Sequence, residues 1–157
     1  MQDWFDEYAE SHQNPFNKMM HWICIPLIFF SVIGLLASIP AGFMQNLVPA
    51  KFAFFANFGT IVIILGLLFY LRISFSMFLG MTVVSLATLL GNYYLAVWNI
   101  APLWQISLGI FVVAWIGQFY GHKVEGAKPS FFKDVQFLMI GPAWLLGFIY
   151  QKLGLKY

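Results

Sequence analysis

Three histidines are the side chains with the clearest capacity for chemistry in this sequence, because the chain carries few other polar groups. Only 9% of its 157 residues are charged, whereas 61% are hydrophobic. His12 and His21 lie just before the first long apolar run, and His122 lies just after the fourth. Neutral imidazole is a common ligand for iron, zinc and copper. If the two segments meet at one membrane face, the three side chains could form one metal site.

The N-terminal segment contains a break that could bring its two histidines together. Pro15 disfavours helix at the asparagine before it, and that asparagine can cap a new helix with Pro15 at its first position. On this helix Asn17 and His21 are four residues apart and therefore share a face. Tyr8 and His12 have the same spacing on the preceding segment. We expect the break to let the two imidazoles converge.

The second segment would place three polar side chains on one helix face. Gln118, His122 and Glu125 occupy positions i, i+4 and i+7 if the fourth helix continues past its apolar part. Gly121 leaves room beside the histidine, and Gly126 is suited to end the helix. Three histidines and a carboxylate suit non-haem iron(II), and zinc could take the same ligands. The alternative is that each histidine lies singly at the headgroup interface, bonded to lipid phosphate or backbone.

The elements that must position these side chains are membrane-spanning helices. A soluble domain is about 25% charged, so this composition indicates an integral membrane protein. A span needs about 20 mostly apolar residues, and four runs qualify: 22–39, 52–71, 73–93 and 102–120. A fifth run, 137–150, is short and contains Gly141 and Pro142, which favours an interfacial or re-entrant helix. We predict one all-α membrane domain over residues 1–157, a four-helix bundle with an N-terminal interfacial helical segment and this short C-terminal helix.

Basic residues in the short loops predict the orientation of the spans. With four spans, one side receives only Lys51, and the other receives Lys18, Arg72, Lys123, Lys128 and Lys133. This imbalance places both termini and all three histidines in the cytoplasm. The compact chain favours a bacterial inner membrane, although an endoplasmic reticulum protein could look the same. The net charge of +2 is too small to indicate a nucleic-acid partner.

Two motifs at these residues resemble a known family. The first motif is Tyr8-x3-His12-Gln13-Asn14-Pro15-x-Asn17-x3-His21. The second is Gln118-Phe119-x-Gly121-His122-x2-Glu125, followed by Lys128-Pro129. Together they are similar to the small membrane proteins related to the 2-hydroxy fatty acid dioxygenase of fatty-acid α-oxidation, and the similarity extends over the whole chain.

The resemblance implies an iron(II)-dependent enzyme that acts at the lipid bilayer on a 2-hydroxy fatty acid and O2. It implies that His12, His21 and His122 are iron ligands or lie next to the ligands. Glu125 would be a fourth ligand or would orient an imidazole through a hydrogen bond. Tyr8, Asn17 and Gln118 would support the ligands. Lys123 and Lys128 would bind the substrate carboxylate, unless these two lysines face lipid phosphate instead.

Two other functions are compatible with the same histidines. A haem protein with two axial histidines would show a Soret band after purification, whereas a non-haem dioxygenase would not. A non-catalytic scaffold or lipid-binding protein would hold no stoichiometric metal. Oxidation of a 2-hydroxy acid by O2 requires no nucleotide cofactor, and the sequence contains no nucleotide-binding glycine motif.

Overall fold

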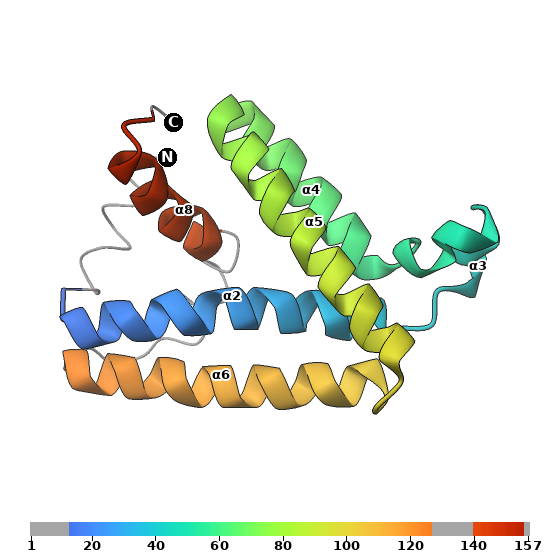
Figure 1. Cartoon of the computed structure of the whole chain (residues 1–157), viewed down its shortest axis with the longest axis horizontal. Coiled ribbons are helices and arrows are strands. Elements are labelled where there is room, and N and C mark those ends of the chain that lie inside the picture. The colour runs from blue at the N-terminus through green and yellow to red at the C-terminus, as the bar shows by residue number, and fades with distance from the viewer. Residues whose placement is uncertain (1–12, 127–139, 156–157) are drawn as a thin grey trace.

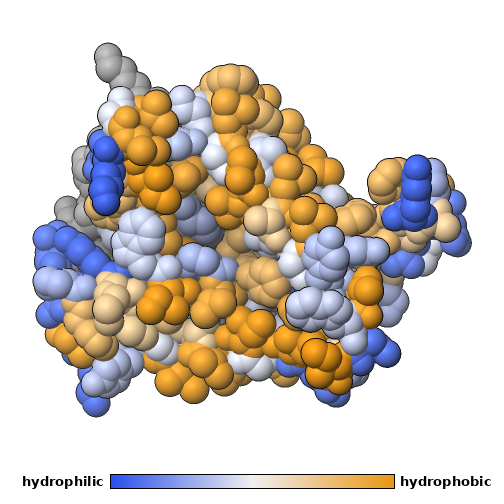
Figure 2. Space-filling model, in the orientation of Figure 1, coloured by the Kyte–Doolittle hydropathy of each residue, from blue (hydrophilic) through white to orange (hydrophobic). Residues whose placement is uncertain are grey.

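The structure of the chain is a computed structural model, and it describes residues 13–126 and 140–155. Every regular element in these ranges is helical: α2 (Pro15–Ala37), α3 (Gly42–Gln45), η1 (Ala50–Phe55), α4 (Phe58–Ile73), α5 (Phe75–Trp98), α6 (Leu103–Glu125) and α8 (Ile140–Lys152). Three of them, α2, α5 and α6, are long and apolar enough to cross a membrane. Hydrophobic residues also cover much of the face shown in Figure 2. The all-α class is therefore confirmed for the described residues, and the four-helix bundle stays a prediction.

The start of α2 follows the predicted cap. Oδ1 of Asn14 accepts a hydrogen bond from the N–H of Phe16 at 2.9 Å. Pro15 is the first helical residue, a position where the lack of a backbone N–H costs no helical hydrogen bond. The helix then continues without interruption to Ala37. One helix therefore contains both the part of the expected interfacial segment that begins at Pro15 and most of the span expected at 22–39. Residues 1–12 of that segment lie outside the described residues.

The apolar run 52–71 was expected to form one helix, and this expectation is wrong in its first part. Residues Ala50–Phe55 form the separate 3-10 helix η1, and α4 begins only at Phe58. Asn57 stabilises the break, because its Oδ1 accepts from an N–H in the first turn of α4 at 3.0 Å and its Nδ2 donates to the Phe54 carbonyl at 2.6 Å. The 16 residues of α4 extend only about 24 Å, which is shorter than the hydrocarbon core of about 30 Å.

A tight hairpin joins α4 to α5, and the near absence of a loop between the apolar runs 52–71 and 73–93 predicts it, with Arg72 at its tip. The first helix ends at Ile73 and the second begins at Phe75. Ser74 between them has an extended backbone, and its Oγ accepts from the N–H three residues later at 3.2 Å. Figure 1 shows the two helices side by side and inclined to α2.

The remaining predicted helices are present, but two of them extend further than expected. The span expected at 73–93 continues to Trp98 as α5, and the span expected at 102–120 continues to Glu125 as α6. Gly126, with a φ of 78°, ends α6 in the left-handed region that glycine adopts most readily. The C-terminal run is helical as α8, although residues 137–139 of the expected 137–150 lie outside the described residues.

The helices α2 and α6 form a close antiparallel pair (Figure 1). Glycines on α6 allow this approach. A Cβ added to Gly117 would lie 2.7 Å from Sγ of Cys24, and one added to Gly121 would lie 2.6 Å from Oδ1 of Asn17. Small residues four positions apart are a common feature of tightly packed membrane helices. This contact brings the C-terminal half of α6 against the N-terminal half of α2.

The other end of the same pair makes a testable packing contact. A Cβ added to Gly34 of α2 would collide with Oγ of Ser107 and Oδ1 of Asn92, both of which are fully buried. We therefore expect Gly34→Ala to lower the free energy of unfolding by about 1–3 kcal/mol. Gly109→Ala is the matched control, because a Cβ there has no neighbour within 4 Å and alanine favours helix by up to about 1 kcal/mol. Thermal unfolding in detergent compares the two variants, and equal shifts would contradict the packing argument.

Candidate metal centre

Two of the three histidines predicted to bind a metal face each other between α2 and α6. The ring centroids of His21 and His122 are 5.0 Å apart, and the ring planes are nearly perpendicular, at 89°. Both side chains are buried, with exposed fractions of 0% and 4%. Segments about a hundred residues apart in the sequence therefore place two imidazoles in one buried position.

A backbone hydrogen bond determines which nitrogen of His21 can bind a metal. Its Nδ1 lies 2.8 Å from the carbonyl oxygen of Asn17, one turn earlier on α2. A carbonyl can only accept, so Nδ1 carries the proton and Nε2 carries the lone pair. Histidines that bind metals usually have such a bond, because it fixes the tautomer and the orientation of the ring. Asn17 and His21 thus interact at the predicted four-residue spacing, through the backbone carbonyl of Asn17.

The carboxylate of Glu125 binds the beginning of α2. Its Oε1 accepts hydrogen bonds from the N–H groups of Gln13 at 2.8 Å and Asn14 at 3.0 Å. Its Oε2 accepts from the N–H of Asn14 at 2.9 Å and from Nδ2 of Asn17 at 3.0 Å. A negative charge at a helix N-terminus is also favoured by the helix dipole. These contacts join the end of α6 to the beginning of α2, and they go to Gln13, Asn14 and Asn17 rather than to an imidazole.

Gln118 contributes a buried acceptor beside this pair. It lies one turn before His122 on α6, and its exposed fraction is only 2%. Its Oε1 has no hydrogen-bond partner among the residues that the structure describes. A buried polar atom without a partner is costly, by about 1–3 kcal/mol. The position therefore suits a bound group that can donate a hydrogen bond.

The other predicted site residues are not brought together in the described part of the chain. Tyr8, His12 and Lys128 lie outside the described residues, and Lys123 is exposed on α6. Within residues 13–126 and 140–155, no three histidine, cysteine or acidic side chains are close enough to hold a metal. The two described histidines fit a metal as a partial ligand set, and a third ligand would have to come from elsewhere, with His12 as the predicted source.

Sequence reasoning missed the partners of Glu125. The backbone N–H groups of Gln13 and Asn14 were not among the predicted site groups, although a signal for them exists. A helix that begins with Pro15 leaves donors at its start that need acceptors. An acidic residue elsewhere in the fold is a natural partner for them.

Comparison with known proteins gives one match. Residues 1–153 match the family model described as 2-hydroxy-palmitic acid dioxygenase Mpo1-like. No curated protein and no solved structure matches the chain. The match covers both motifs that carry the histidines.

Proposed function

We propose that this chain, which belongs to the Mpo1-like family, is an iron(II)-dependent dioxygenase of 2-hydroxy fatty acids. The reaction converts the 2-hydroxy acid and O2 into a fatty acid one carbon shorter, CO2 and water. Both oxygen atoms are consumed, and the substrate supplies all four electrons, so no further reductant is needed. The observation that carries the proposal is the buried pair of His21 and His122 between α2 and α6.

The chain's own residues would hold the metal and keep its ligands in place. His21 would bind through Nε2, because the Asn17 carbonyl occupies Nδ1–H, and His122 and His12 would complete the histidine set. Iron(II), when bound, would supply a template that brings O2 and the substrate together. Glu125 would hold the beginning of α2 against α6, so that the two imidazoles keep their separation.

Polar side chains near the histidines would orient the substrate. Oε1 of Gln118 is buried beside His122 and would accept a hydrogen bond from the 2-hydroxyl of the substrate. Lys123, which is exposed on α6, and Lys128 would attract its carboxylate through their positive charges. The packed helices bury the pair and Gln118, which would strengthen the hydrogen bond to the Gln118 side chain.

The location of the site follows from the proposed topology. With four spans, the excess of basic residues on one side would place the histidine pair and both termini in the cytoplasm. The host would be a bacterial inner membrane, or the endoplasmic reticulum in a eukaryote. A fatty-acid substrate would then reach the site from the bilayer, with its polar head at the cytoplasmic interface.

Metal analysis combined with a turnover assay tests the proposed function. The full chain, purified without oxygen, is expected to contain one iron per chain. On addition of 2-hydroxypalmitate and O2 it should release CO2 and pentadecanoate in equal amounts. A Soret band in the purified protein would indicate a haem protein instead. Absence of stoichiometric metal together with absence of product would indicate a lipid-binding or scaffold protein.

A further inference from the structure

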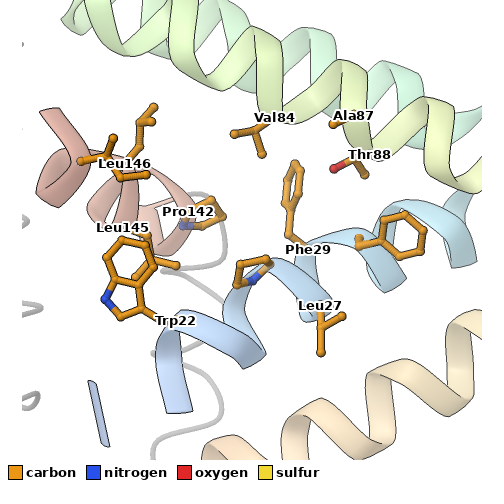
Figure 3. A pocket seen from close by; sticks show the side chains of 12 residues that line it. Trp22, Leu27, Phe29, Val84, Ala87, Thr88, Pro142, Leu145 and Leu146 are labelled. Atoms are coloured by element: carbon orange, nitrogen blue, oxygen red, sulfur yellow. The ribbon is translucent and has the colours of Figure 1, made fainter. Parts of the chain in front are cut away.

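A large apolar cavity lies on the side of α2 that faces away from α6. It has a volume of about 420 Å³, is lined by residues of α2, α5 and α8, and is partly open to the surroundings (Figure 3). This volume falls within the range of about 300–1,000 Å³ that is usual for small-molecule pockets. Thr88 is the only lining residue with a polar side-chain oxygen, and none of the lining residues is charged.

The cavity and the histidine pair lie on different faces of α2, but their positions along the helix axis overlap. On one face of α2, His21, Cys24 and Ile28 are buried toward α6. The next residue after His21, Trp22, already lines the cavity, and Phe30 lines its other end. These two positions are about 12 Å apart along a helix axis. The cavity therefore extends from the level of the histidines toward the middle of α2.

The lining selects a hydrocarbon chain as the occupant. Water in a cavity needs two to four polar partners, and the lining side chains supply only the indole N–H of Trp22 and the hydroxyl of Thr88, which lie at opposite ends of the cavity. The α2 segment that contributes Trp22, Pro26 and Phe29 belongs to a helix long and apolar enough to span the membrane. An unbranched chain of methylenes fits this shape and chemistry, because its burial against apolar side chains is favourable by about 0.8 kcal/mol per methylene.

We propose that this cavity holds the hydrocarbon tail of the 2-hydroxy fatty acid while its carboxylate and 2-hydroxyl lie at the His21–His122 pair. The tail passes around α2 beside Trp22 and continues toward Phe30. This inference rests on the proposed function, since it assigns the tail of the same substrate. It also identifies the residues that determine chain length, which are those at the end of the cavity away from Trp22.

Ala87 and Thr88 of α5 lie at that far end, as Figure 3 shows. Ala87 lines the cavity with a small side chain, so a larger side chain there would enter the cavity. The variant Ala87→Phe should therefore shorten the cavity and leave the part near Trp22 open. Val113→Phe is the matched control, because Val113 of α6 is 68% exposed and does not line the cavity.

A chain-length comparison with these variants tests the inference. For Ala87→Phe we expect the KM for 2-hydroxypalmitate to rise about tenfold or more, since several methylenes lose their contacts. The KM for 2-hydroxyoctanoate and the iron content should stay at the values of the unmodified chain. Val113→Phe should leave all three quantities unchanged. Equal effects of Ala87→Phe on the long and the short substrate, or no effect on either, would overturn the assignment.

A labelling experiment separates this inference from the proposed reaction. The probe is 2-hydroxypalmitate with a photoreactive diazirine at its methyl end, added without oxygen to the full chain in phosphatidylcholine nanodiscs. We expect label on the α5 and α8 residues that line the cavity, and we expect excess 2-hydroxypalmitate to suppress it. Label outside the cavity, or label that only added phospholipid suppresses, would refute a fatty-acid tail as the occupant. Cavity label in a chain that turns over no 2-hydroxy acid would support the tail site and refute the proposed reaction.

Discussion

Replacing His122 with alanine is expected to abolish stoichiometric iron binding and to lower the rate of 2-hydroxypalmitate turnover by at least about 10³-fold. The reason is that His122 is one of two imidazoles that face each other in the buried pair. A small apolar side chain leaves the metal with one fewer nitrogen ligand. His21→Ala should have the same effect, because its Nε2 would supply the other nitrogen of the pair. Elemental analysis and an O2-consumption assay measure both effects.

The control for these variants must show that the fold survives. Val113→Ala shortens an exposed side chain of α6 that lies about 13 Å along the helix axis from His122, so it should retain iron and activity. All variants should keep the helical circular dichroism of the unmodified chain. If His122→Ala is folded and retains both iron and activity, the assignment of the pair as metal ligands is wrong.

Replacing Glu125 with alanine is expected to weaken iron binding and turnover by about 10–100-fold without removing a metal ligand. The carboxylate accepts hydrogen bonds from the N–H groups of Gln13 and Asn14 and from the side chain of Asn17. Without it, the beginning of α2 loses these hydrogen bonds to α6, and the Asn17 carbonyl that orients His21 is held less firmly. Unpaired donors should also lower the free energy of unfolding by about 1–3 kcal/mol.

A conservative variant distinguishes this positioning role from metal ligation. Glu125→Gln keeps one carbonyl oxygen for the α2 donors, so its iron affinity should fall between those of the unmodified chain and Glu125→Ala. Val124→Ala, at the exposed neighbouring position, should leave iron affinity unchanged. Iron titration followed by thermal unfolding of each iron-free protein measures both quantities. Complete loss of iron from Glu125→Gln, as severe as in His122→Ala, would instead indicate that Glu125 is a ligand.

Several local features were predictable because they depend on a few neighbouring residues. The cap at Asn14 and Pro15, the hairpin beside Arg72 and the end of α6 at Gly126 all appear where the sequence indicates them. Each uses a side chain or a backbone conformation that is strongly restricted by residue type. The family was also recognisable from two motifs, and the match over residues 1–153 confirms it.

The break at Asn57 shows where apolar composition misled the prediction. A run of apolar residues indicates that a segment is buried or faces lipid, but it does not indicate where a helix begins. Asn57 lies within that run and was counted as part of the span. Its side chain hydrogen-bonds both to the Phe54 carbonyl and to the first turn of α4, and these local bonds separate η1 from α4.

The sequence by itself determined the helical class of the described residues, the start of α2 and the end of α6. It also singled out the three histidines as candidate metal ligands. These depend on composition and on contacts within one turn of helix. Only the tertiary structure decided that His21 and His122 are adjacent, that Glu125 turns toward the start of α2, and that a cavity lies behind Trp22. These depend on how closely α2 can approach α6, which Gly117 and Gly121 permit. The spacing of residues along a helix indicates which side chains share a face, but it does not indicate which neighbouring helix that face contacts.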